Sequence, residues 1–133
     1  MTEFSKLPDG FRATAQRAAL ACMTEVVGIN AVVIATIDGF DLAAAVREGI
    51  DAARIAAMAS SISAISAMVA REAGLGTIKS VTIGTDNGFA VVHAVARFDV
   101  ELVVHVIADG DAILSQVMHR IGVMGKVLSS AGG

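Results

Sequence analysis

The chain has 133 residues, of which 55% are hydrophobic and 17% are charged, with a formal net charge of −3 and one cysteine. Without a run of Lys or Arg it offers no cationic surface to nucleic acid, and a single cysteine allows no intrachain disulfide, which fits the reducing cytoplasm. The 16-residue uncharged stretch at 55–70 is shorter than the ~20 residues that span a bilayer, so we expect no membrane insertion and a cytoplasmic domain that hides a surplus of apolar surface.

The first residues predict a lead-in followed by a helix. Residues 1–10 are polar and contain the one proline, so we expect a flexible lead-in to a single domain over 11–130. Residues 11–27 carry good helix formers and no glycine. Gly28 then ends the pattern, as glycine commonly does after a helix.

A strand pair and a long helix are predicted next. The apolar run 31–37 favours a strand covered on both faces. Asp38-Gly39 is a hairpin turn signal that leads into a shorter strand at 42–46. Asp51 then occupies a helix N-cap position, and the helix pattern continues to about residue 73.

Three strands and a helix complete the chain. Strands are predicted at 78–83, 89–95 and 98–107, with a hairpin turn at Asn87-Gly88 and period-two alternation from Phe98 onward. The turn at 109–111 is expected to cap a final helix. Its apolar stripe consists of Ile113, Val117, Ile121, Met124 and Leu128. The order α-β-β-α-β-β-β-α predicts an α+β fold, in which a five-stranded antiparallel sheet is sandwiched between helices.

The middle helix carries two stripes and, between Arg54 and Arg71, no charge. We expect the large side chains to cover the sheet; they are Ile55, Met58, Ile62, Ile65 and Val69. Small side chains lie opposite, at Ala53, Ala56, Ser60, Ser63, Ala67 and Ala70. Small residues let two helices approach closely, and two-fold homodimers are the commonest assembly. The small-residue stripe is therefore our predicted dimer interface, the alternative being that Ala fills exposed positions for helix propensity alone.

Polar side chains indicate no reaction centre. His93, His105 and His119 are predicted on separate elements without metal-ligand spacing, so we expect no metal and no cofactor. Cys22 is interpreted as a small core residue. Asp99 and Glu101 share a face of the predicted last strand and are interpreted as a solvated strand end. No catalytic residue is assigned, and we expect no enzyme.

Two segments, VVGINAVVI at 26–34 and DGFDLA at 38–43, resemble the core signature of the roadblock/dynein light chain family. The helix after Asp51, the Asn87-Gly88 turn and the final helix follow in the family's order. The resemblance covers about residues 11–130. It implies homodimers in which the middle helices pair and the third strands join two sheets into one. For bacterial members it also implies non-enzymatic regulation of a small Ras-like GTPase.

A partner-binding ridge is predicted beside the dimer interface on the middle helix. It comprises Arg54, Ala57, Ser61, Ala64, Met68 and Arg71, a weakly charged row of the kind that marks a protein-binding site. The alternative function is a small-ligand sensor with a profilin-like or PAS-like sheet. Such a sensor needs convergent polar groups in a pocket, and the strand interiors offer chiefly Thr36, Thr82 and His93.

Overall fold

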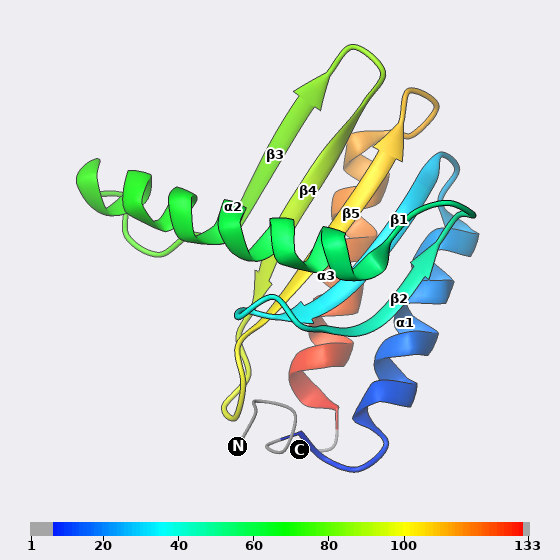
Figure 1. Ribbon diagram of the computed structural model, residues 1–133, viewed down its shortest axis with the longest axis horizontal. Coiled ribbons are helices and arrows are strands. Elements are labelled where there is room, and N and C mark those ends of the chain that lie inside the picture. Colours follow the sequence, from blue (N-terminus) through cyan, green and yellow to red (C-terminus); the bar gives the residue numbers. More distant parts are fainter. Residues whose placement is uncertain (1–6, 132–133) are drawn as a thin grey trace.

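The computed structural model describes residues 7–131, and the order of its elements is the predicted one (Figure 1). Most of the lead-in predicted for 1–10 lies outside the described residues. The elements are α1 (Phe11–Glu25), β1 (Ile29–Thr36), β2 (Asp41–Val46), α2 (Ala52–Glu72), β3 (Ser80–Thr85), β4 (Gly88–Val95), β5 (Leu102–Asp109) and α3 (Leu114–Ser130).

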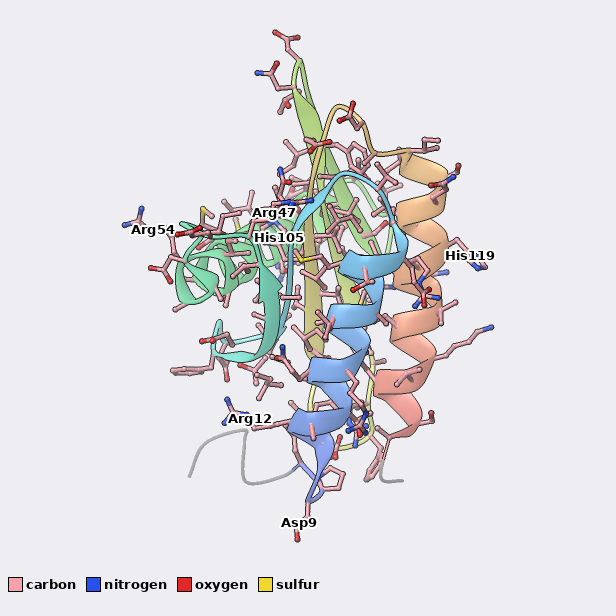
Figure 2. The ribbon with its side chains drawn as sticks, turned by 90° about the vertical axis from the view of Figure 1, so that its right-hand side faces the viewer. Asp9, Arg12, Arg47, Arg54, His105 and His119 are labelled. Atoms are coloured by element: carbon pink, nitrogen blue, oxygen red, sulfur yellow. The ribbon has the colours of Figure 1, made fainter. Side chains whose placement is uncertain are left out.

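The five strands form one antiparallel sheet in the order β2-β1-β5-β4-β3. Helices α1 and α3 cover one face of this sheet and α2 crosses the other (Figures 1 and 2). The central strands β1 and β5 are covered on both faces, as the apolar run of β1 predicted, whereas the period-two alternation of the β5 segment had indicated a single apolar face. The predicted α+β sandwich is confirmed, with β2 and β3 at its two edges.

The main core lies between the sheet and the pair α1 and α3. Val32 and Ile34 of β1 and Val104 of β5 point into it and are fully buried. Cys22 of α1 is also fully buried there. Burial raises the pKa of the Cys22 thiol to about 11, because the apolar surroundings disfavour the thiolate. Cys22 is thus the core residue that its position on an apolar helix face predicted.

Most strand boundaries differ by one or two residues from the sequence prediction, and two further differences have an identifiable structural cause. Strand β5 begins at Leu102, and Phe98, which the alternation placed on the strand's buried face, is 84% exposed. Helix α3 begins at Leu114, and no side chain caps its first turn. The carboxylate of Asp109 instead accepts a hydrogen bond from the backbone N–H of Asp111, which stabilises the turn before the helix.

Arg97 explains why the chain before β5 is not a strand. Its guanidinium donates two hydrogen bonds to the Asp99 carboxylate, at 2.8 and 2.9 Å. It also donates to the backbone carbonyls of Leu128 and Ala131 at the end of α3, and it lies 4.8 Å from the centroid of the Phe11 ring. The hydrogen bonds from Arg97 hold the pKa of Asp99 below its usual value. The predicted solvated strand end is therefore wrong for Asp99, which pairs with the buried Arg97, and Arg97 in turn contacts α1 and α3.

The β1–β2 turn passes directly beneath α2. Gly39 of this turn has φ +98°, a left-handed conformation that favours glycine. A Cβ at Gly39 would lie 3.2 Å from the Ser60 Cβ and 3.5 Å from the Ala57 Cα. The Asp38-Gly39 signal therefore marks both a turn and a close approach to the helix.

Candidate interaction surface

Helix α2 covers the sheet with its N-terminal half and projects past β3 with its C-terminal half (Figure 1). The helix begins where the sequence predicts, because the Asp51 carboxylate accepts hydrogen bonds from the backbone N–H groups of Ala53 and Arg54. Ile55 and Ala56 pack on β1, and Ala59 packs on Val92 and Val103. The projecting half consequently leaves much of its surface without cover from the sheet.

The two stripes of α2 do not face the directions that we predicted. The small-residue side lies partly on the sheet: Ala56 packs on β1, and the Ser60 hydroxyl donates a hydrogen bond to the Ile37 carbonyl at 2.9 Å, while Ala70 is buried farther along the helix. Ser63 is half-buried, while Ala53 and Ala67 are exposed. Small side chains face the sheet because the β1–β2 turn passes too close to the helix for larger ones.

The large side chains of α2 are mostly exposed, contrary to the prediction that they cover the sheet. Ile55 is buried and Ile62 is half-buried, but Met58, Ile65 and Val69 are 44, 63 and 60% exposed. The physical reason is that the helix is turned so that Ile55, Ala56 and Ala59 meet the sheet, which leaves the three exposed side chains outside that contact. Within the described part of the chain, α2 is the one helix long and apolar enough, by length and composition, to cross a membrane. Helix α2 has this length and composition although its uncharged stretch, at 55–70, is only 16 residues long.

A groove of about 770 Å³ lies under the projecting half of α2. Ser63, Ala67 and Arg71 line it from the helix, and Val81 and Val92 line it from β3 and β4. Strand β3 is the sheet edge nearest this groove, and five of its six residues are exposed. An open strand edge and an apolar groove thus lie side by side.

The predicted partner-binding ridge lies on the exposed side of α2. All six of its residues are exposed, namely Arg54, Ala57, Ser61, Ala64, Met68 and Arg71. The Ser61 hydroxyl donates to the Ala57 carbonyl one turn earlier, so it is occupied within the helix. Two arginines at the ends and a methionine between them give the ridge an apolar centre with a positive charge at each end.

The three histidines lie apart. His105 is buried on β5 under α2, and its Nδ1 lies 3.3 Å from the Ile55 carbonyl oxygen. His93 faces the opposite side of the sheet, and its buried Nδ1 has no hydrogen-bond partner; His119 is exposed on α3. Among residues 7–131, no group of three His, Cys, Asp or Glu side chains could hold a metal ion.

The buried His105 predicts a pH dependence of stability. Burial lowers the pKa of His105 below 6.5, and the hydrogen bond with Ile55 opposes this more weakly. The unfolded chain therefore takes up the proton first, and stability falls as the pH drops from 6.5 toward the folded pKa, by at most about 1.4 kcal/mol per pH unit. Urea unfolding between pH 5 and 7.5 should show a shallower pH slope in His105→Leu. Equal slopes in wild type and His105→Leu would contradict the assignment.

Comparisons with known proteins agree with this architecture. Residues 16–114 match the family described as the Roadblock/LC7 domain. The gliding protein MglB from Thermus thermophilus superposes with a TM-score of 0.79 at 13% identity, over 92% of this chain and 91% of that one. A Roadblock/LC7 domain from Streptomyces avermitilis gives 0.74 at 17% identity, over 84 and 91%. MglB from Myxococcus xanthus gives 0.69 at 18%, over 97 and 89%. No curated protein sequence matches the chain significantly.

Proposed function

Because the chain belongs to the Roadblock/LC7 domain family, we propose that it is a cytoplasmic, non-enzymatic, homodimeric adaptor that binds a small Ras-like GTPase and modulates its nucleotide cycle or localisation. The observation that carries the proposal is the exposed apolar surface of α2 beside an open sheet edge. Contiguous exposed apolar surface of this kind is typical of protein-binding sites. The family resemblance supplies the class of partner.

The dimer contact is proposed at the groove, through α2 and β3. Of the six predicted interface residues, Ala56 and Ala70 are already covered within the chain, whereas Ser63 and Ala67 line the groove. We place the α2 helix of a second copy in this groove, packed on Ser63 and Ala67, with its exposed Ile65 and Val69 supplying the apolar area. Pairing of the two β3 strands would join the sheets, as the family resemblance implies.

The GTPase is proposed to bind the ridge, whose residues other than Arg71 lie outside the groove that the second copy would fill. Ala64 lies at the centre of this ridge, between the charged ends Arg54 and Arg71. An apolar centre with a positively charged rim suits a partner whose contact surface is apolar at its centre and acidic around it. The side chain of Ala64 is exposed, so a change there should affect binding and leave the fold intact.

Ala64→Glu is expected to leave the dimer intact and to weaken GTPase binding at least tenfold, because it places a charge at the centre of the contact. Binding is measured by biolayer interferometry with a small Ras-like GTPase of the source cell, loaded in turn with GDP and with a non-hydrolysable GTP analogue. Ala13→Glu makes the same change at an exposed alanine of α1, across the sheet, and should bind normally. Unchanged binding by a dimeric Ala64→Glu variant would remove the ridge from the proposal.

The groove also favours a second candidate, the small-ligand sensor. Its volume of about 770 Å³ would admit a metabolite, although the strand residues that line it, such as Val81 and Val92, are apolar. A thermal-shift screen with nucleotides and metabolites separates the two functions. A ligand that raises the melting temperature of the wild type but not that of Ser63→Glu would support the sensor. Stabilisation by the GTPase alone would support the adaptor.

A further inference from the structure

The outer edge of β2 is occupied by a side chain of α1. The Gln16 carboxamide donates a hydrogen bond from Nε2 to the Ala44 carbonyl at 2.7 Å, and its Oε1 accepts one from the Ala44 N–H at 3.0 Å. A neighbouring antiparallel strand would make the same reciprocal pair of bonds with Ala44. Gln16 therefore takes the place of a strand residue.

The register confirms that these groups of Ala44 face away from the sheet. The backbone N–H of Arg47 donates to the Asn30 carbonyl, so Asn30 and Arg47 form a hydrogen-bonded pair of the β1–β2 ladder. Such pairs alternate along antiparallel strands. Val33 and Ala44 are consequently a non-hydrogen-bonded pair, and Ala44 directs both its backbone groups outward, toward Gln16.

A second side chain of α1 acts at the irregular end of β2. The register shifts by one residue between Ile34 and Ala35, which leaves Leu42 as the extra residue of a bulge. Arg12, at the N-terminal end of α1 (Figure 2), donates from Nε to the Leu42 carbonyl at 3.2 Å. Two side chains one helical turn apart thus bind consecutive outward-facing groups of β2.

The opposite edge has no such cover. The backbone N–H of Ala94 donates to the Lys79 carbonyl, and the alternation from this pair turns the backbone groups of Ser80, Thr82 and Gly84 away from β4. Among the described residues, no side chain hydrogen-bonds the backbone of these three. The sheet therefore has one edge closed by α1 and one edge open.

We propose that Gln16, with Arg12, blocks strand addition at β2, so that assembly of this chain through its sheet occurs at β3 alone and stops at two copies. An open strand edge is a template for pairing with another chain. Two open edges would let sheets join end to end without closure, whereas one open edge gives a closed two-fold pair. The final number of copies rests on the β3 pairing of the proposed function. The blocking of β2 by Gln16 does not depend on that pairing.

The test removes the cap and measures the mass in solution. Gln16→Ala keeps a good helix former at an exposed position while exposing both backbone groups of Ala44. Arg17→Ala makes a matched truncation at the next residue, whose guanidinium bonds Thr14 of the same helix. Thr82→Pro removes an outward N–H of β3, and the double variant Gln16→Ala/Thr82→Pro combines the two changes. Each is examined by sedimentation velocity from 5 to 500 μM, with circular dichroism to verify folding.

Gln16→Ala is expected to form species larger than two copies that grow with concentration, while wild type and Arg17→Ala stay at twice 13.5 kDa. The double variant should be limited to two copies, because only β2 remains open. Hydrogen exchange at the Ala44 amide should accelerate at least tenfold in Gln16→Ala. Should this variant not fold, the near-isosteric Gln16→Met replaces it.

A folded Gln16→Ala variant that keeps the wild-type mass at every concentration would overturn the proposal. Failure of the proposed β3 pairing has a different signature: wild type would be a single copy, with the same mass as Thr82→Pro. In that case, a Gln16→Ala variant that forms pairs of copies through β2 would still support the cap. A Gln16→Ala variant that stays a single copy would refute it.

Discussion

Arg97→Met should lower the free energy of unfolding by about 3–5 kcal/mol, the usual cost of removing one partner of a buried ion pair. The Arg97 side chain is fully buried, and Asp99 is 11% exposed. Methionine fills much of the space but removes the guanidinium donor from the carbonyls of Leu128 and Ala131 and leaves the Asp99 carboxylate only its hydrogen bond from a backbone N–H. The measurement is urea unfolding at pH 7, followed by far-UV circular dichroism.

Arg120→Met is the matched control. Its guanidinium lies 3.0 Å from the Glu25 carboxylate, but the pair is far more exposed than that of Arg97. Exposed pairs contribute at most about 1 kcal/mol, so this variant should unfold close to wild type. Equal losses in Arg97→Met and Arg120→Met would show that burial of the Arg97 pair is not what stabilises the fold.

Ala67→Glu should convert the proposed dimer into single copies or aggregates. Ala67 lines the groove under α2, and a glutamate there is larger than the close helix contact allows and would lose its water against the second copy. Taking a carboxylate out of water costs several kcal/mol even with Arg71 nearby, which corresponds to a weakening of association by more than about a hundredfold. Light scattering at 50 μM should therefore give 13.5 kDa rather than twice that mass.

Ala67→Glu and Ala64→Glu form a pair that separates the two surfaces of one helix. Both residues are exposed in the single chain, so neither substitution should disturb the fold. Ala67→Glu is expected to abolish dimerisation, and Ala64→Glu to abolish GTPase binding only. A normal dimer mass for Ala67→Glu, with Ala13→Glu as the control, would move the interface away from the groove.

Local patterns predicted the elements well because their signals are local. The Asp51 cap, the Asp38-Gly39 turn and the apolar runs of β1 and β5 each depend on residues within a few positions of one another. The order of these elements was sufficient to predict the α+β class. Where a distant partner decides the conformation, the same patterns were wrong. Phe98 alternates correctly for a strand, but Arg97 and Asp99 hold that segment as a loop.

The candidate site was predicted only in part. The sequence indicated that α2 has two sides without charge, but it could not show which side meets the sheet. That choice depends on the β1–β2 turn, which approaches Ala57 and Ser60 from 18 or more positions earlier in the chain. The bonds between Gln16 and Ala44 likewise join residues 28 positions apart. A lone glutamine on an exposed helix face carries no local signal for such a role.

The close approach of the β1–β2 turn to α2 has a consequence for how the sequence can vary. Positions 39 and 60 compete for one small volume, since a Cβ on Gly39 would lie 3.2 Å from the Ser60 Cβ. Because Gly39 also has φ +98°, a side chain there is strained whatever residue occupies position 60. In natural variants we therefore expect glycine to persist at position 39 and small residues at position 60, although 20 residues separate the two positions in the chain.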